Sequence, residues 1–227
     1  MSEYVSPGRN ARRDLSVDQQ AALRSAATTL LDEFGHLFGV ETIEGFLHAS
    51  YDQFAARATV ANYLPLLAER FARQRLRALA IVEGRAGAGV PTVLFLCAHN
   101  AGRSQIALGY FTHMAGDRAV AWSGGSAPGD IVDPLVIEAM AEQGIDISEE
   151  YPKPWTEEIV RAADVVISMG CGDTCPTVPG RGCGCGCGCE EWDLADPDGR
   201  GIDDIREIRD EIHRRVRALA AQLGISP

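Results

Sequence analysis

Residues 93–104 read Val93-Leu94-Phe95-Leu96-Cys97-Ala98-His99-Asn100-Ala101-Gly102-Arg103-Ser104. The apolar residues at the beginning predict a short buried strand. The chain then turns through a small loop and is expected to enter a helix at Arg103. In such a unit the backbone N–H groups of the loop can converge on one tetrahedral anion, and the positive end of the helix favours its charge. The stretch therefore predicts a cradle for an oxyanion.

The side chains of this stretch predict a nucleophile beside the anion. Cys97 ends the strand six residues before Arg103, whose guanidinium can bind an anion through two parallel N–H groups. The same positive field favours the thiolate of Cys97, which is the form that attacks. Ser104 can donate a hydrogen bond to that thiolate, and Asn100 can hold the loop through its side chain. The predicted anion-binding residues are Asn100, Ala101, Gly102, Arg103 and Ser104.

A cysteine at the end of a strand is more often only a buried apolar residue. The spacing Cys-x5-Arg-Ser between a strand and a helix is much more specific, because it meets the structural context that such a motif requires. We therefore interpret Cys97 as a nucleophile and not as a packing residue.

Residues 97–105 resemble the phosphate-binding loop of low-molecular-weight tyrosine phosphatases and of the arsenate reductases built on the same fold. The segment from His99 to Ser104 is more similar to the reductases. Phosphatases of this group usually carry a second cysteine before the arginine, where this chain has Gly102. The resemblance extends from Thr92 to Leu223 and implies reduction of arsenate to arsenite. The alternative it leaves open is a phosphatase for phosphotyrosine or a small phosphoester.

The 227-residue chain has an uneven charge distribution. Residues 1–90 contain ten arginines, no lysine and ten acidic residues, so the remaining part carries the whole net charge of −11. An acidic catalytic part argues against nucleic acid or a membrane surface as partner. No apolar run approaches the roughly 20 residues of a membrane span, and residues 1–13 lack the apolar core of a signal peptide. We expect a cytoplasmic protein.

The first part of the chain predicts a small helical domain over residues 1–83. Apolar residues recur at helical spacing over 17–38, 42–57 and 60–81, and Pro65 near the start of the third stretch is either tolerated or causes a kink. The simpler interpretation is a bundle that only packs and caps the rest. The functional interpretation is a homodimer through these helices, because a small bundle has a small core. A similar helical extension occurs in some actinobacterial arsenate reductases.

The glycine-rich residues 84–91 predict a linker, and residues 92–227 form the second predicted domain. In it, strands are expected at 92–96, 119–123 and 164–169, with a weaker one at 190–193. Helices are expected at 104–114, 134–143, 155–162 and 202–223. This alternation predicts an α/β fold, a parallel four-stranded sheet with helices on both faces, and the cradle at the carboxyl ends of its strands.

Two further cysteines are predicted to form a redox relay with Cys97. Cys171 and Cys175 follow the strand that ends at Met169, so they leave the sheet at the same edge as Cys97. In this relay Cys97 attacks the anion, Cys171 attacks the sulfur of Cys97, and Cys175 then attacks Cys171. The alternatives are a pair of zinc ligands or inert thiols.

The resemblance supports the relay, since these two cysteines look like the redox pair of thioredoxin-linked arsenate reductases. It implies thioredoxin as the electron donor, or a low-molecular-weight thiol such as mycothiol with a glutaredoxin- or mycoredoxin-like protein. We expect no cofactor. The order in which Cys171 and Cys175 attack is left open.

An acid is needed to protonate the leaving oxygen. Asp196 before Pro197 resembles the Asp-Pro acid of the family, and Asp193 is its competitor. Either aspartate can instead only start a turn. Phosphatases of this family usually have a tyrosine close to the acid that stacks on the substrate ring, where this chain has Asp198 and Gly199. This difference favours a small inorganic anion.

A tract of alternating glycine and cysteine precedes the predicted acid. Its thiols can wrap a soft ion or arsenite, which predicts, as a third function, a metalloid-binding or sensing module. The simpler interpretation is a low-complexity insertion. The cysteines concerned are Cys183, Cys185, Cys187 and Cys189.

Overall fold

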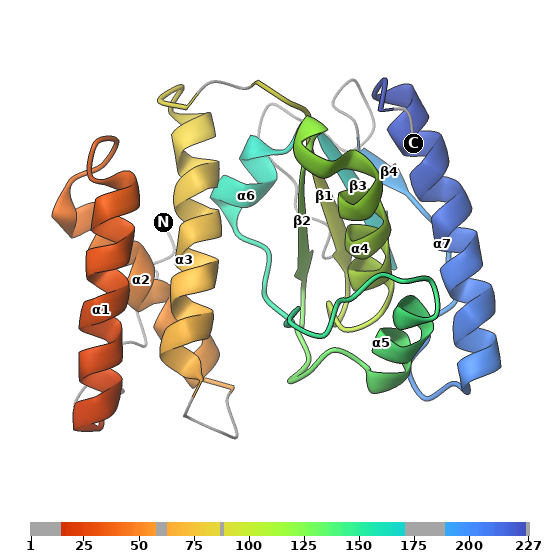
Figure 1. The fold of residues 1–227 in the computed structure, drawn as a ribbon, viewed down its shortest axis with the longest axis horizontal. Coiled ribbons are helices and arrows are strands. Elements are labelled where there is room, and N and C mark those ends of the chain that lie inside the picture. Colours follow the sequence, from red (N-terminus) through yellow and green to blue (C-terminus); the bar gives the residue numbers. More distant parts are fainter. Residues whose placement is uncertain (1–14, 58–62, 87–88, 171–188, 226–227) are drawn as a thin grey trace, which may run out of the picture. The chain divides into compact units, whose positions relative to one another are not determined.

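The computed structural model describes residues 15–57, 63–86, 89–170 and 189–225. The chain divides into two compact units, residues 1–86 and 87–227, which are drawn together in Figure 1. Within these described residues, no helix combines the length and the apolarity that crossing a lipid bilayer requires.

Unit 1 consists of α1 (Val17–Phe34), α2 (Val40–Ala55) and α3 (Leu64–Val82), which contact one another pairwise (Figure 1). The three predicted helices are confirmed. The Ser16 side chain accepts a hydrogen bond from the N–H of Gln19 and closes a capping box at the start of α1. Phe54 packs edge-on against Phe71 with ring centroids 5.6 Å apart. Leu23, Leu30 and Phe34 of α1 are buried as well, which explains the apolar spacing along all three helices.

The predicted end of the first helix needs correction. α1 ends at Phe34 and not near Phe38, because the next residues form tight turns in which Leu37 and Phe38 both donate to the Phe34 carbonyl. α3 begins at Leu64, and the predicted earlier start at residue 60 lies outside the described residues. Pro65 falls in the first turn of α3, where a missing N–H costs no helical hydrogen bond, so the helix has no cause to kink there.

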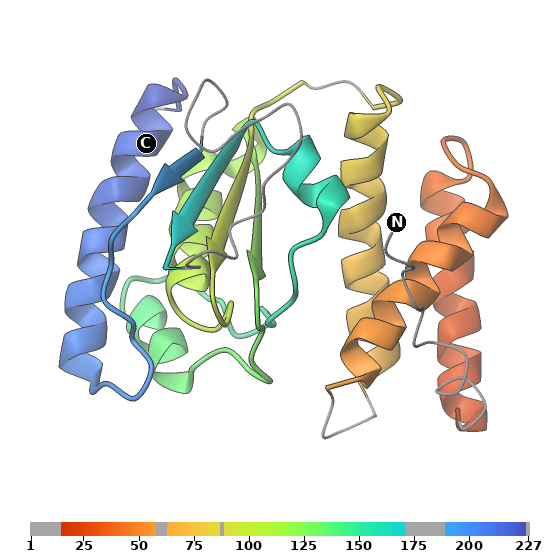
Figure 2. The ribbon, with the colours of Figure 1, turned by 180° about the vertical axis from the view of Figure 1, so that it is seen from behind.

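Unit 2 is built on a parallel sheet of four strands in the order β2-β1-β3-β4. Figures 1 and 2 show the sheet from its two sides. The strands are β1 (Thr92–Cys97), β2 (Val120–Gly125), β3 (Val165–Met169) and β4 (Cys189–Glu191). The predicted α/β fold is confirmed. The fourth strand begins one residue before its predicted range and ends two residues earlier; the N–H of Trp192 makes its last ladder hydrogen bond, to the Ser168 carbonyl.

Helices cover both faces of this sheet. α4 (Arg103–Ala115), α5 (Pro134–Ala141) and α7 (Ile202–Gln222) contact one another on one face; a short turn, η2 (Gly116–Arg118), follows α4. α6 (Glu157–Ala162) contacts β1 on the other face. In Figure 2 the strands lie in front of α4.

Two of these helices are shorter than predicted. α5 ends at Ala141, and the chain turns there to reach the left-handed Gly144. α6 begins at Glu157 and not at Trp155, because the N–H of Trp155 bonds to the Gly125 carbonyl at the end of β2. The segment before α6 is therefore tied to the carboxyl edge of the sheet.

The central strand β1 places Cys97 at this edge. Every residue of β1 is buried, and Phe95 packs against Phe111 of α4 and Trp192, with centroids 5.7 and 6.2 Å apart. Cys97 aligns with Gly125 of β2 and with Met169 of β3, the last residue of each strand. The chain after Cys97 therefore begins beside the points at which β2 and β3 end.

A stacked pair of rings joins α4 and α7. The half-buried His213 lies parallel to Tyr110, with ring centroids 4.3 Å apart and planes at 3°. Burial, together with the positive charge of Arg217, lowers the pKa of His213 below its usual value of 6.5, against the opposing effect of Asp210. The folded protein therefore binds a proton at this site less readily than the unfolded chain does.

The free energy of unfolding should consequently depend on pH through His213. The stabilisation is fully present above the unfolded pKa of about 6.5, and it is lost as the pH falls below that value, since the unfolded state then takes up the proton first. In His213→Gln we expect a smaller loss of stability between pH 7.5 and 5.5 than in the wild type, measured by urea unfolding. His113→Gln, at an exposed position of α4, is the control. Equal pH dependence in wild type and His213→Gln would contradict the prediction.

Candidate active site

The loop after β1 turns its carbonyl groups outward. They accept hydrogen bonds from the N–H groups of the segment 126–133, in the pairs Ser126–Cys97 (3.4 Å), Ala127–Ala98 (2.9 Å), Gly129–His99 (2.9 Å) and Asp133–Ala101 (3.0 Å). In a trans peptide the C=O and the following N–H point in opposite directions. The N–H groups that follow these carbonyls therefore point away from the segment 126–133.

One of these N–H groups bonds to the sulfur of Cys97. The N–H of Asn100 donates to Cys97 Sγ at 3.2 Å. Asn100 has a φ of +49°, a left-handed conformation that asparagine adopts more readily than most residues. Its side-chain Oδ1 accepts the N–H of Lys153 at 2.9 Å. The side chain thus holds the loop to the segment before α6, as the sequence predicts.

The sulfur of Cys97 lies in a polar setting although only 2% of the residue is exposed. Ser104 Oγ is 3.0 Å from Cys97 Sγ and accepts a hydrogen bond from Asn100 Nδ2 at 2.8 Å. Because the hydroxyl already accepts from the amide, its own proton can point to the sulfur. The N-terminus of α4 adds positive potential at the same point. The sulfur is therefore close to a hydroxyl, a backbone N–H and a helix N-terminus.

Arg103 brings a buried positive charge to the cradle. Its Nη2 is 2.5 Å from Asp196 Oδ2, and its Nη1 donates to the Leu194 carbonyl at 3.3 Å. Its Nε is buried and has no hydrogen-bond partner among the described residues. An unpaired buried donor is costly, so this nitrogen is suited to an acceptor that arrives with a ligand.

The structure separates the two aspartates that compete for the role of acid. Asp196 reaches Arg103 and also accepts the N–H of Asp198 at 3.2 Å. For Asp193, the backbone carbonyl accepts a hydrogen bond from Arg215 at 3.2 Å. Asp196 therefore lies at the cradle, 93 residues after Arg103 in the chain.

A cavity of about 40 Å³ lies above the loop. At 10–15 Å³ for each water it has room for about three waters, which suits a small tetrahedral anion. The residues that line it are Cys97, His99, Ala101, Gly102, Arg103, Asp133, Asp196, Pro197 and Asp198. The structure thus brings the predicted nucleophile, guanidinium and acid together around one small space.

Not all predicted residues fall within the described part of the chain. Cys171, Cys175, Cys183, Cys185 and Cys187 lie outside it, and for Cys189 only the backbone, at the start of β4, is described.

The approach to the first of these cysteines is described. Gly170 has a φ of +72°, and a Cβ on it would be 2.7 Å from Arg103 Nη1. The chain therefore leaves β3 directly against the cradle, one residue before Cys171. Within the described residues no group of three His, Cys, Asp or Glu side chains is arranged to hold a metal ion.

Two residues that support the cradle were not predicted. Gln105 is fully buried, and its Nε2 donates to the Asn100 carbonyl at 3.0 Å and to the Tyr151 carbonyl at 3.3 Å. Lys153 holds Asn100 through its backbone N–H. A glutamine directly after Arg-Ser at the start of a buried helix could have been noticed, but a backbone donor leaves no signal in the sequence.

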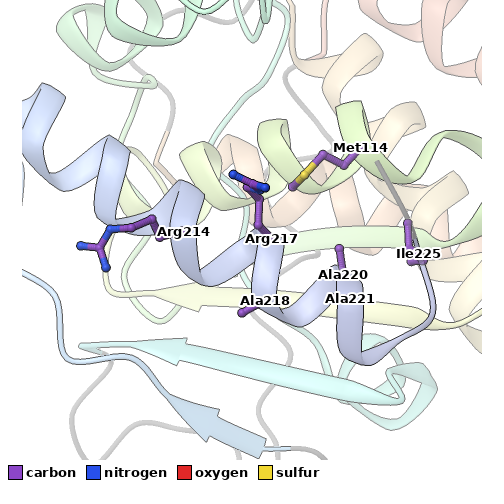
Figure 3. Close-up of a pocket in the computed structure, with 7 residues that line it drawn as sticks. All are labelled: Met114, Arg214, Arg217, Ala218, Ala220, Ala221 and Ile225. Atoms are coloured by element: carbon purple, nitrogen blue, oxygen red, sulfur yellow. The ribbon is translucent and has the colours of Figure 1, made fainter.

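A larger pocket of about 320 Å³ lies between the end of α4 and α7 (Figure 3). Its lining residues are Met114, Arg214, Arg217, Ala218, Ala220, Ala221 and Ile225. It has no nucleophile and none of the predicted site residues, and Arg214 is already paired with Glu211. The small cavity at the cradle is therefore the candidate active site.

Two protein-family models match the chain in succession. Residues 23–80 match the N-terminal domain of protein-tyrosine-phosphatase-like proteins. Residues 92–180 match low molecular weight phosphotyrosine protein phosphatase. The second match includes β1, the cradle and α4.

Similar proteins are named for arsenate reduction. A solved thioredoxin-dependent arsenate reductase of Corynebacterium glutamicum is 41% identical, with a TM-score of 0.79 over 92% of this chain and 100% of that chain. A putative arsenate reductase of Halobacterium salinarum is 35% identical over 130 residues, which are 54% of this chain and 85% of that protein. A glutaredoxin arsenate reductase of Synechocystis is 34% identical over 133 residues, which are 58% and 98% of the two chains.

The hydroxyl of Ser104 should raise the reactivity of Cys97. Removing it in Ser104→Ala takes away a hydrogen bond to the sulfur, a loss of about 1 kcal/mol that corresponds to about fivefold slower alkylation by iodoacetamide at neutral pH. The rate is read from the peptide that contains Cys97 by mass spectrometry, because the chain has seven cysteines. Ser123→Ala is the matched control, since this buried hydroxyl has no hydrogen-bond partner among the described residues. An unchanged rate in Ser104→Ala would argue against this contribution.

Proposed function

Because the chain belongs to the arsenate reductases that share the low-molecular-weight phosphatase fold, we propose that it reduces arsenate to arsenite with thiols as the source of electrons. The observation that carries this proposal is the cradle itself. A buried thiol accepts hydrogen bonds within it, and the Nε of the adjacent Arg103 has no partner among the described residues. In the overall reaction arsenic acid and two thiols give arsenious acid, one disulfide and one water.

The first step is attack of the Cys97 thiolate on arsenic. The inward N–H groups of the loop and the guanidinium of Arg103 hold the oxyanion and stabilise the charge that develops on it. A bond forms between sulfur and arsenic while one oxygen leaves. The carboxyl group of Asp196 stands beside the cavity and protonates that oxygen, so that it departs as water.

The second step moves two electrons to arsenic. The thiolate of Cys171 attacks the sulfur of Cys97, and the electron pair of the sulfur–arsenic bond passes to arsenic, which leaves as arsenite. Cys175 then attacks Cys171 and releases the Cys97 thiolate. Gly170 supports this sequence, because it brings the chain to Arg103 one residue before Cys171. The oxidation ends as a disulfide between Cys171 and Cys175.

A protein thiol must reduce this disulfide after each turnover. The Corynebacterium glutamicum relative is thioredoxin-dependent, and the Synechocystis relative is a glutaredoxin arsenate reductase. We propose a thioredoxin or a mycoredoxin-like protein as the donor for this chain. The relay needs thiols that stay reduced between turnovers, which supports a place in the cytoplasm.

Cysteine variants test the relay in a single turnover without any reductant. Reduced wild-type protein mixed with excess arsenate should lose two thiols and release one arsenite. Cys97→Ser and Cys171→Ser should each slow arsenite release by at least about 100-fold, as expected when a nucleophile is removed. Cys183→Ser, the same exchange outside the relay, should react like the wild type. Arsenite release at the wild-type rate by Cys171→Ser would discard the relay.

A phosphatase is the second candidate, favoured by the match of residues 92–180 to the phosphotyrosine phosphatase model. It would need only Cys97, Arg103 and Asp196. The same variants decide between the two functions. Hydrolysis of p-nitrophenyl phosphate that survives Cys171→Ser, in a protein that does not reduce arsenate, would establish the phosphatase.

We also propose that the helices of unit 1 form a homodimer. Val40, Tyr63 and Leu66 are large apolar residues of this unit with more than half of their surface exposed, which supports an apolar contact with a second copy. Analytical ultracentrifugation should show a dimer of the full chain, and Leu66→Glu should weaken it. A monomer at high micromolar concentration would refute this association.

A further inference from the structure

The segment that carries the acid touches the start of α4 at a position without a side chain. A Cβ placed on Gly102 would lie 2.5 Å from Cγ of Pro197, closer than non-bonded carbon atoms can approach. Gly102 directly precedes Arg103, and Pro197 directly follows Asp196. This one contact therefore joins the two parts of the site that are far apart in the chain.

The rest of the acid segment is anchored and cannot shift without cost. At its start Trp192 is 2% exposed and packs against Phe95, and its N–H donates to the Ser168 carbonyl at 2.7 Å. Further along, α7 begins at Ile202 and buries Ile205 in the core. Between these anchors the contact of Pro197 with Gly102 sets how close Asp196 comes to the cradle.

We propose that Gly102 is a positioning residue for the acid. Because it has no side chain, Pro197 seats directly on the start of α4 and brings the carboxylate of Asp196 within 2.5 Å of Arg103 Nη2. The inference rests on the proposed function, in which Asp196 is the proton donor. It gives a reason for glycine at the place where the resembling phosphatases usually have cysteine.

The size of the expected effect follows from the contact distance. The 2.5 Å approach must lengthen to at least about 3.5 Å, the normal separation of two carbon atoms, so a methyl group on residue 102 displaces Pro197 by about 1 Å. A misplacement of about 1 Å can slow a catalysed step by about 100-fold. The displaced part is the segment that carries Asp196, because the N–H groups of the loop make no hydrogen bond to Pro197.

The chain offers a compensating change at the partner residue. The same Cβ on residue 102 would be 3.7 Å from Cβ of Pro197, which is an ordinary contact. Pro197→Ala removes Cγ and Cδ and keeps this Cβ. The double variant Gly102→Ala with Pro197→Ala therefore has room for the new methyl group and requires no displacement.

Four proteins test the inference: the wild type, Gly102→Ala, Pro197→Ala and the double variant. The single-turnover rate of arsenite release should fall about 10- to 100-fold in Gly102→Ala. The dissociation constant of inorganic phosphate should change by less than about threefold, since the anion-binding donors stay in place. In the double variant the rate should return to within about threefold of Pro197→Ala alone.

Several outcomes would overturn the inference. They are a wild-type rate in Gly102→Ala, an equal loss of phosphate binding and rate, or a double variant no faster than Gly102→Ala. A structure of Gly102→Ala tests it without any activity, because Asp196 should be displaced by about 1 Å, and an undisplaced carboxylate would refute it. Failure of the proposed function looks different: the wild type itself would release no arsenite, whatever the structure of the variant shows.

Discussion

The site depends on the way in which the peptide groups between Cys97 and Arg103 are turned. Their carbonyls are held outward by the segment 126–133, and planarity of the peptide then directs the amides inward. No side chain is needed to create this positive concavity. Cys97 is the last residue of β1 and lies within this concavity, so the thiol is buried and close to hydrogen-bond donors.

This constraint explains why several buried polar residues surround an apolar strand. The side chain of Asn100 bonds to Ser104 and to the backbone N–H of Lys153. The side chain of Gln105 donates to the carbonyls of Asn100 and Tyr151. Each of these contacts keeps a loop in place that would otherwise lose its orientation. A cradle of amides is useful only when it is rigid before the anion arrives, because reorganisation during the reaction costs part of the stabilisation.

The predicted acid, Asp196, reaches the cradle by a different route. It comes from a segment after β4, held by Trp192 in the core and by Pro197 on Gly102. Its ion pair with Arg103 shows how close the two parts lie. Arg103 Nε has no hydrogen-bond partner among the described residues. The guanidinium is therefore paired with Asp196 through Nη2, and its Nε can donate to a bound anion.

Local sequence determined much of this protein. The apolar run before Cys97, the Ser16 capping box and the alternation of strands and helices depend on neighbouring residues, so they were predictable. The end of α1 at Phe34 and the start of α6 at Glu157 were not predictable. Tight turns decide the first, and the hydrogen bond from Trp155 to the Gly125 carbonyl decides the second. Tertiary structure alone decided the placement of Asp196 against Arg103, the contacts of Gln105 and Lys153, and the contact of Pro197 with Gly102. These contacts join segments that lie tens of residues apart in the chain. They depend on distances and on backbone donors, which no pattern of neighbouring residue types encodes.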